Sequence, residues 1–436
     1  MKTNSVINKT IENWNKVYFD GDLSLKVIQH LEGLELDKRN EKAQVFLERM
    51  FRYMKIAGIQ AIDFSDQQAK QLKLVSKLVE DVWQGFILPF TLEERHKKID
   101  EFIRKSRWLN SDIPGKFLDV GCGFPPHTTI ETAALFPDWK VIGLDPNLPK
   151  YLVKDRENNY ATFDEDYHIQ YFQGAPGQSL EIWNDPEKAK SYFKDLFKTL
   201  LLLLPDEYEI KDSIVTNERG VLIRNPALNY ETSNLFFYKG SIGGFNINEV
   251  NVVRCFNVLF YFDKVFRNKS LGWFCEILKE GGCLICGING NHSIRCRYTV
   301  YRKEGGKMVA KEFAFSIDNI RPLGSVAWAA FHDDDEETNT LVELIGVLRS
   351  NKNFTEKYDM RLDQLLRKKE MYIRDKDGYL IALDTNMSPK EKEKRSVEIV
   401  EQLSNEGYVE AAVLELQEQG YNAYRNEIGF IAISLE

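Results

Sequence analysis

Apolar side chains recur at helical spacing through the first quarter of the chain. In residues 40–57 they fall three or four positions apart, on one face of a helix, at Val45, Phe46, Met50, Tyr53 and Met54. Residues 66–83 repeat this pattern. No turn-rich segment interrupts the stretch, so it predicts a helical N-terminal unit.

The pattern changes at residue 113 to short strands that alternate with helices. Residues 116–120 (KFLDV) form an apolar run, and the glycine-bearing loop 121–126 (GCGFPP) follows it. Thr128 and Glu131 have the spacing of a capping box, which predicts a helix start. Residues 140–144 (KVIGL) form a second strand that ends in Asp145. Together these segments predict one βαβ unit with a right-handed crossover.

Later segments extend the alternation and end in antiparallel pairs. Buried strands are predicted at residues 235–238, 250–255 and 283–288, and a β-hairpin at 298–315 around Gly305-Gly306. Helices are predicted within 338–371 and 389–419, before final strands at 421–425 and 428–434. This order indicates an α/β protein with a largely parallel sheet.

Charge and composition indicate which kinds of partner the chain is suited to bind. The chain has 58 Lys and Arg against 66 Asp and Glu, a net charge of −8, which is unfavourable for binding a nucleic-acid backbone. No apolar run approaches the length of about 20 residues that spans a bilayer. The polar N-terminus and six scattered cysteines favour a cytoplasmic protein that binds neither nucleic acid nor membrane.

The glycine loop and the acid after the second strand predict a nucleoside site. A tight loop of glycines lets a ligand approach the backbone, and an acid such as Asp145 can accept hydrogen bonds from ribose hydroxyls. A dinucleotide fingerprint needs a small residue where Pro126 stands, and no G-K-[ST] of a P-loop follows Gly123. Both phosphate-binding patterns therefore fail.

The run FLDVGCGFPP…VIGLDPN resembles the first two motifs of class I S-adenosylmethionine-dependent methyltransferases, although Pro125 replaces their usual third glycine. The resemblance implies a Rossmann-like sheet, mostly parallel with a terminal antiparallel hairpin, and S-adenosyl-L-methionine as the cofactor. The local runs FNVLFYFDK and ILKEGG are also similar to CheR-type methyltransferases, which have a helical N-terminal domain.

This resemblance implies roles for individual residues. The methionine part would lie at the loop, the ribose at the end of the second strand, and the adenine at the turn after the third. The implied cofactor-binding residues are Asp119, Gly121, Cys122, Gly123, Asp145, Pro146, Ser241, Ile242 and Asn257. Asn257 would face the methyl group; alternatively, it ties the strand end to a neighbouring backbone group. His127 is a candidate base, with a structural role at the helix start as the alternative.

The resemblance also divides the chain. A helical N-terminal domain would occupy residues 1–112 and a methyltransferase domain residues 113–436, with core segments 113–150, 234–290 and 388–436. Insertions 151–233 and 291–387 would form a substrate cap. We therefore expect methyl transfer to oxygen or nitrogen of a small molecule. Methylation of a protein or peptide, and a catalytically silent binding protein, remain alternatives. The oligomeric state stays open, a homodimer included.

Two clusters raise the question of metal binding. Cys283 and Cys286 are three apart on a predicted strand, so their side chains point to opposite faces. The acidic run 332–337 (HDDDEE) precedes a helix, whose dipole favours acids, and a solvated helix cap accounts for it. We predict no metal site. The aromatic cluster in residues 160–172 fits a substrate wall and a packed core equally well.

Overall fold

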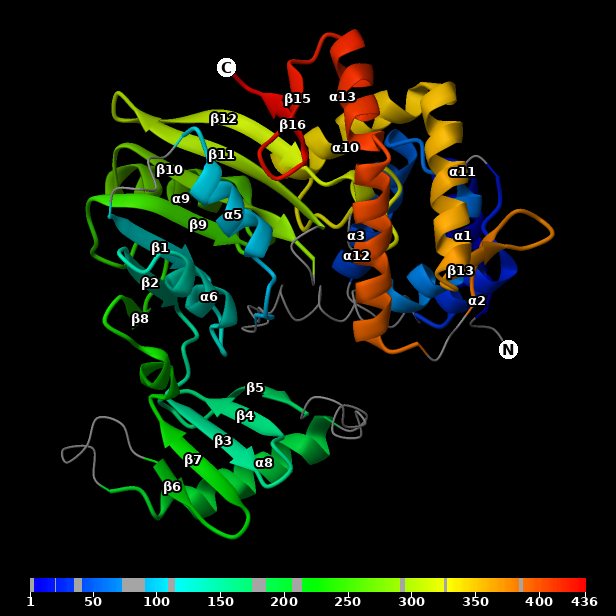
Figure 1. The fold of residues 1–436 in the computed structure, drawn as a ribbon. Coiled ribbons are helices and arrows are strands. Elements are labelled where there is room, and N and C mark those ends of the chain that lie inside the picture. Colours follow the sequence, from blue (N-terminus) through cyan, green and yellow to red (C-terminus); the bar gives the residue numbers. More distant parts are fainter. Residues whose placement is uncertain are drawn as a thin grey trace.

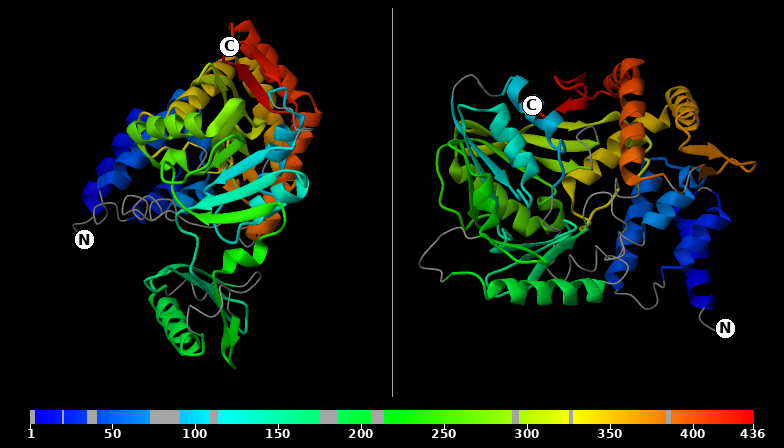
Figure 2. Two further views of the ribbon diagram at one scale, coloured as in Figure 1. Left: turned by 90° about the vertical axis from the view of Figure 1, so that its left-hand side faces the viewer. Right: turned by 60° about the horizontal axis from the view of Figure 1, so that its bottom comes forward.

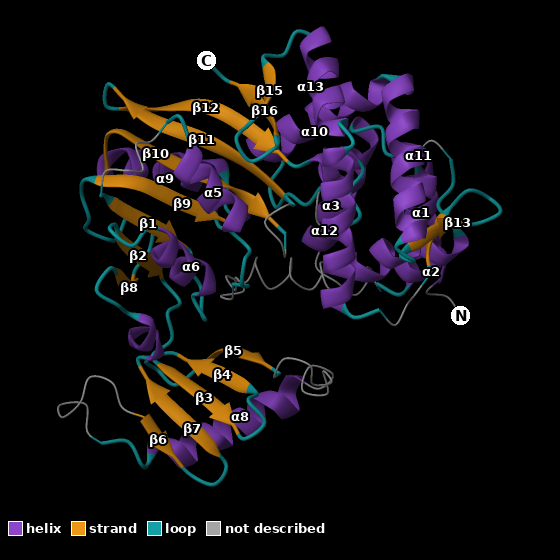
Figure 3. Cartoon of the chain, viewed as in Figure 1, coloured by secondary structure: helices purple, strands orange, loops and turns teal. Residues whose placement is uncertain are grey.

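The computed structural model describes residues 4–19, 21–34, 41–72, 91–108, 114–174, 186–205, 214–290, 295–324, 328–383 and 387–436. Its centre is a nine-stranded sheet in the order β15-β16-β12-β11-β10-β9-β1-β2-β8 (Figures 1 and 3). Helices cover both faces of this sheet, and a second, smaller sheet lies beyond its β8 edge (Figure 2).

Five strands of the large sheet are parallel. They are β8 (Leu235–Lys239), β2 (Lys140–Asp145), β1 (Lys116–Val120), β9 (Val250–Phe256) and β10 (Leu278–Asn289). Numbered along the chain, these strands have the spatial order 3-2-1-4-5, the order of a Rossmann-like doubly wound sheet. The predicted fold class is confirmed, because near-continuous apolar runs such as β9 are buried on both faces.

Four antiparallel strands continue the sheet beyond β10. They are β11 (Cys296–Glu304), β12 (Lys307–Phe315), β16 (Ile431–Ser434) and β15 (Ala423–Arg425). The hairpin predicted at 298–315 and the terminal hairpin are both present. However, the first hairpin pairs with β10 and separates it from the terminal one. The prediction that residues 291–387 lie wholly in a cap is therefore wrong, since β11 and β12 supply two strands of the sheet.

Helices pack on the two faces through separate apolar clusters. On one face α5 (Lys97–Lys105) and α6 (His127–Leu135) cover Phe117, Val141 and Val252. On the other face α9 (Lys264–Ile277) covers the side chains that alternate with these along the strands. Because α5 packs on the sheet, the predicted boundary at residue 112 is wrong: this helix belongs with the strands.

The remaining N-terminal helices share a core with helices from the end of the chain. α1 (Asn4–Tyr18), α2 (Leu25–Glu32) and α3 (Glu41–Ile56) pack in one cluster with α10 (Glu336–Ser350), α11 (Lys352–Lys368), α12 (Pro389–Asn405) and α13 (Tyr408–Glu418) (Figure 1). The expectation of a separate N-terminal domain is therefore corrected. The apolar face of each helix was predicted, but its partners lie some 300 residues away. Of the helix expected at 66–83, residues 66–72 are helical and 73–83 lie outside the described residues.

Within this helical body, a buried carboxylate joins the two ends of the chain. Asp63, in η2 (Ala61–Asp63), lies 2.6 Å from the guanidinium of Arg374 and 3.8 Å and 3.7 Å from those of Arg321 and Arg349. Short elements complete the body: η5 (Ile317–Ile320), β13 (Tyr372–Arg374) and β14 (Leu380–Ala382). No described helix has the length and apolarity needed to cross a bilayer.

The insertion 151–233 is a small α/β unit. Its sheet has the order β5-β4-β3-β7-β6, with antiparallel pairs between β3 (Tyr151–Asp155), β4 (Tyr160–Phe163), β5 (Ile169–Gln173), β6 (Ile214–Thr216) and β7 (Gly220–Arg224). α8 (Pro186–Leu201) covers one face, where Phe163 stacks on Phe197 with ring centroids 4.2 Å apart. Part of the aromatic cluster at 160–172 is therefore a packed core, whereas Tyr160 lies against the cluster of the large sheet.

Two predicted helix starts have different outcomes. α6 begins at His127 after Pro126, without a side-chain cap, so the capping box is wrong. Instead, the hydroxyl of Thr128 contacts that of Thr91 (3.3 Å), and Glu131 accepts from the backbone of Glu94 (2.8 Å). At α10, Asp335 caps the helix as its acidic start suggested. The cap is not solvated as we expected, because the side chain of Asp335 is buried; the neighbouring Glu337 is partly buried.

Candidate active site

The order of the parallel strands locates a site before any side chain is considered. In a doubly wound sheet, ligands bind outside the carboxyl ends of the strands, where the strand order reverses. Here that point lies between β1 and β9, which pair directly although strands β2 to β8 all lie between them in the sequence. The loops that follow Val120, Asp145 and Phe256 therefore surround the expected site.

The loop after β1 depends on its two glycines. Gly121 and Gly123 have φ values of +77° and +63°, a left-handed conformation that favours glycine. The Gly121 N–H donates to the carbonyl of Leu144 at 2.8 Å, which holds the loop against the end of β2. A Cβ atom on Gly121 would lie 2.4 Å from Cγ2 of Val258. The loop therefore contacts the segment after β9 so closely that position 121 has no room for a side chain.

Asp145 fixes the same loop from the neighbouring strand. Its side chain is buried, with 6% of its surface exposed. Oδ2 accepts from the N–H of Gly123 at 3.0 Å, and Oδ1 accepts from the N–H of Asn147 at 2.7 Å. Burial raises the pKa of this carboxyl group, while both backbone bonds oppose the rise. Since a carboxylate has about four acceptor positions, Asp145 can still accept from a diol.

Asp119 is engaged inside the protein. Its carboxylate accepts two hydrogen bonds from the guanidinium of Arg254, at 3.0 Å and 2.7 Å, and one from the hydroxyl of Thr129 at 2.6 Å. Arg254 also donates to Asp100 of α5. Asp119 therefore holds the end of β1, directly before the glycine loop, against β9 and α5.

Arg254 was missed by the sequence reasoning, although it is the one charged residue within β9 (VNVVRCF). Its side chain is fully buried. Burial alone would lower the pKa of Arg254, but Asp100 and Asp119 outweigh it and the pKa rises. Burial likewise raises the pKa of Asp100 to about 6, against the lowering effect of Arg254.

Asn257 follows β9 in the left-handed region, with φ of +56°. Its side chain pairs with Asn289 at the end of β10: Asn257 Nδ2 donates to Asn289 Oδ1 at 2.9 Å, and Asn289 N donates to Asn257 Oδ1 at 3.2 Å. Of the two roles considered for Asn257, the structure shows the tie between strand ends. Asn289 had no signal in the sequence.

The Asn289 amide also anchors the segment before α5. Its Nδ2 donates to the carbonyl of Arg95 at 2.6 Å and to Nδ1 of His96 at 2.9 Å. His96 is buried, and burial, followed by the charges of Arg254 and Arg95, lowers its pKa well below the usual value. It is therefore neutral. Tyr261 lies in the short helix η4 (Leu259–Tyr261) after Asn257, and burial raises its pKa to about 12.

The other predicted residues have varied settings. Cys122 is buried, and burial raises its thiol pKa well above the usual value, so it is no nucleophile. Ile242 packs on the α9 face of the sheet, while Ser241 is exposed after β8, and Pro146 follows Asp145. His127 is partly exposed, with Nδ1 3.9 Å from Glu93.

The start of α6 is poorly suited to bind phosphate. A helix N-terminus binds anions through free N–H groups. Here Pro125 and Pro126 have none, and His127, Thr129 and Ile130 donate to the carbonyls of these two prolines at 3.0–3.2 Å. The helix start therefore has fewer free backbone donors than a nucleotide diphosphate needs.

Metal binding finds no support in the described residues. They contain no group of three or more His, Cys, Asp or Glu side chains that could hold an ion. Cys283 and Cys286 belong to the clusters on opposite faces of the sheet, as predicted.

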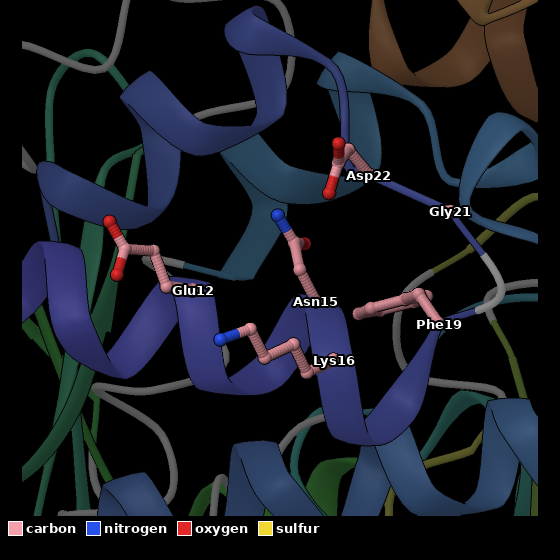
Figure 4. A pocket seen from close by; sticks show the side chains of 6 residues that line it. All are labelled: Glu12, Asn15, Lys16, Phe19, Gly21 and Asp22. Carbon is pink, nitrogen blue, oxygen red and sulfur yellow. The ribbon is translucent and has the colours of Figure 1, made fainter.

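A depression lies on the helical body, at α1 and the residues that precede α2 (Figure 4). It is lined by Glu12, Asn15, Lys16, Phe19, Gly21 and Asp22. Asn15 Oδ1 accepts from the backbone of Leu23 at 3.3 Å, so this side chain fixes the turn before α2. Nothing in the depression connects it with the glycine loop.

No protein-family model and no curated protein matches the chain. Solved structures with low similarity include the protein PKMT2 of Rickettsia typhi in complex with AdoHcy, at 13% identity and a TM-score of 0.22 over 46% of this chain and 26% of that one. Another is an O-methyltransferase family 2 protein of Planctomyces limnophilus in complex with apigenin, at 11% identity and a TM-score of 0.20 over 61% of this chain and 47% of that one.

A third is an S-adenosylmethionine-dependent methyltransferase of Clostridium acetobutylicum, at 12% identity and a TM-score of 0.21 over 54% of this chain and 77% of that one. The chain thus spans less than half of the first two proteins. Similarity at this level transfers neither activity nor substrate to this chain.

Proposed function

We propose that this chain binds S-adenosyl-L-methionine and transfers its methyl group to oxygen or nitrogen of a small-molecule acceptor. One observation carries the proposal. A buried carboxylate, Asp145, and a two-glycine loop meet at the topological switch point, beside a helix start where two prolines have no N–H and three of the next N–H groups are occupied. This combination suits a nucleoside with a free diol and no phosphate.

The residues fit such a cofactor part by part. Asp145 would accept from the ribose hydroxyls, and Gly121 and Gly123 would let the amino-acid part approach the backbone. The turn after β8, with Ser241 and Ile242, would border the adenine, because β8 is the neighbour of β2 at the sheet edge.

The bound cofactor would supply an activated methyl group, so the protein needs to position the acceptor and exclude water. The pair of Asn257 and Asn289 fixes the strand ends that would face the acceptor. His96 is held neutral there, although its Nδ1 is occupied by Asn289. Tyr261 adds a protonated phenol from η4.

The insertion 151–233 supports an enclosed acceptor. It leaves the sheet just after β2 and returns just before β8, the two strands that would border the nucleoside. η3 (Pro226–Tyr230), at its end, contacts the glycine loop, since the rings of Tyr230 and Phe124 lie 6.1 Å apart in an edge-to-face arrangement. A cap coupled to the cofactor loop favours a small molecule, and the net charge of −8 disfavours nucleic acid.

Calorimetry with S-adenosylhomocysteine tests the proposal. We expect the wild type to bind it and Asp145→Ala to bind it with about 1–3 kcal/mol less free energy, from lost charge-assisted hydrogen bonds. Asp155→Ala is a matched control: that carboxylate also accepts backbone N–H groups, of Glu157 and Asn159, but in the small sheet. No binding by a folded wild type would refute the proposal. Equal affinities of wild type and Asp145→Ala would remove Asp145 from the site.

The acceptor class needs a separate assay. The protein is incubated with a cell extract and S-adenosylmethionine that carries a radioactive methyl group, and the extract is then separated by molecular mass. We expect the label in the small-molecule fraction and not in the protein fraction. Label confined to protein would favour the alternative of protein methylation. Tight cofactor binding without any label in either fraction would favour a silent binding protein.

A further inference from the structure

The segment that precedes α5 brings an arginine to the strand ends of the proposed site. Arg95 Nε donates to the carbonyl of Gly290 at 2.9 Å, and Nη2 donates to that of Asn289 at 3.4 Å. In return, Asn289 Nδ2 donates to the carbonyl of Arg95 at 2.6 Å. These bonds fix the guanidinium just beyond the carboxyl end of β10, one side chain away from Asn257.

Arg95 differs from its neighbours in having no counter-charge within the described part of the chain. Arg254 is paired with Asp100 and Asp119, and Arg295 lies 3.6 Å and 3.5 Å from Asp318 and Glu393. By contrast, no carboxylate of the described residues contacts Arg95, whose bonds all go to backbone carbonyls.

Because Arg95 is largely buried, the lack of a paired carboxylate among the described residues lowers the stability of the fold. Burial lowers the pKa of the guanidinium, yet the side chain keeps part of its surface exposed. The group therefore lies deep among protein atoms but can still be reached. A charge withdrawn from water without a partner lowers stability. A binding role gives a reason for keeping it, because a ligand can supply the missing charge.

The guanidinium N–H groups of Arg95 that do not bond to the two carbonyls indicate what kind of ligand it binds. The two carbonyls occupy Nε and Nη2, and no described residue accepts from Nη1. Guanidinium N–H groups match the planar geometry of a carboxylate. Phosphate is a poorer candidate because two prolines and three occupied N–H groups at the nearby start of α6 leave few backbone donors to help hold it.

We propose that Arg95 binds a carboxylate in the active site. This inference rests on the proposed function, which supplies two sources for the ligand: the amino-acid part of the cofactor, or the acceptor. Both would present a carboxylate near the end of β10, where Asn257, Asn289 and Arg95 meet.

Two nucleosides separate these sources. S-adenosylhomocysteine has the carboxylate and 5′-methylthioadenosine lacks it, while both have the adenosine part. If Arg95 binds the cofactor, Arg95→Gln should weaken S-adenosylhomocysteine about 10- to 100-fold, the loss of one charge-assisted hydrogen-bonded pair, and leave methylthioadenosine unchanged. Arg95→Lys should restore part of the affinity, because it keeps the charge without the planar fork.

If Arg95 binds the acceptor, neither nucleoside should change. Acetate and benzoate, titrated with and without S-adenosylhomocysteine, should then bind to the wild type and not to Arg95→Gln. Arg295→Gln is the control, since its positive charge is already neutralised nearby; both variants should retain the melting temperature within the range of surface substitutions. Equal binding of every probe by wild type and Arg95→Gln overturns the inference. Failure of the wild type to bind either nucleoside instead refutes the proposed function, and the carboxylate titration still tests Arg95.

Discussion

Replacing Arg254 by methionine should lower the free energy of unfolding more than replacing an exposed arginine by methionine does. Methionine keeps an unbranched side chain that reaches about as far as Nε of arginine, but it removes the charge and all four hydrogen bonds that Arg254 donates: two to Asp119, one to Asp100 and one to Thr132. These partners come from β1, α5 and α6, so the substitution loosens the join between both helices and the centre of the sheet.

The magnitude follows from what remains buried. Removing one member of a buried ion pair costs about 3–5 kcal/mol, because the other charge is left uncompensated. Two carboxylates remain here, but burial already raises the pKa of Asp100 to about 6 and Arg254 was opposing that rise. In the variant Asp100 should therefore take up a proton, and one uncompensated charge, on Asp119, remains. We expect a loss of about 3–5 kcal/mol, smaller at pH 5 than at pH 8.

Urea denaturation followed by tryptophan fluorescence at both pH values measures this loss. Arg219→Met is the control, because Arg219 and Asp195 form an exposed ion pair at 2.8 Å, and such pairs contribute about 0–1 kcal/mol. The variant should also bind S-adenosylhomocysteine more weakly, since Asp119 precedes the glycine loop. A loss at pH 8 no larger than that of Arg219→Met would refute the reasoning.

Two further predictions test the glycine loop and the partly buried acid Glu337. Gly121→Ala should abolish measurable binding of S-adenosylhomocysteine in calorimetry, because its Cβ would clash with Val258. Gly378→Ala is the control for backbone strain, since Gly378 has φ of +88° and a Cβ there would meet nothing within 4 Å. Binding retained by Gly121→Ala would contradict the prediction. Burial, followed by Asp335, raises the pKa of Glu337 from 4.5 to about 7. The folded state therefore holds this proton more tightly, and stability falls by about 3 kcal/mol as the pH rises from 4.5 to 7. Glu337→Gln should flatten this decline in urea denaturation at pH 5 and 8; an unchanged slope would count against it.

The parts of the fold that the sequence predicts are those encoded locally. Strands β1 and β2, the loop between them and α6 follow one another within 30 residues, so hydrophobic period and glycine placement suffice. The position of β11 and β12 in the sheet depends on pairing at an edge, which no local pattern specifies. The capping box failed for a related reason: a separate segment, around Thr91 and Glu94, occupies the side chains of Thr128 and Glu131.

The residues of the candidate site likewise fall into those that a local pattern predicts and those that depend on tertiary contacts. The glycines and Asp145 can be predicted as candidates from the sequence, because the backbone conformation and the strand end favour those residue types. Asn289 and His96 were not, because each has its role only through contact with a distant strand or helix. Arg254 is intermediate: a charged residue inside an apolar strand is a visible anomaly, but its partners Asp100 and Asp119 come from other elements.

Arg95 shows why such residues escape a sequence pattern. It stands in the run TLEERHKKID, where its charged neighbours form ordinary surface pairs: Lys97 with Glu94 at 2.8 Å, and Lys98 with Glu101 at 3.4 Å. Contact with the backbone at the end of β10 separates Arg95 from this set, and no carboxylate among the described residues pairs with it. Its binding role therefore depends on the tertiary fold, and a variant that displaces the end of β10, such as Asn289→Ala, should weaken carboxylate recognition even with Arg95 intact.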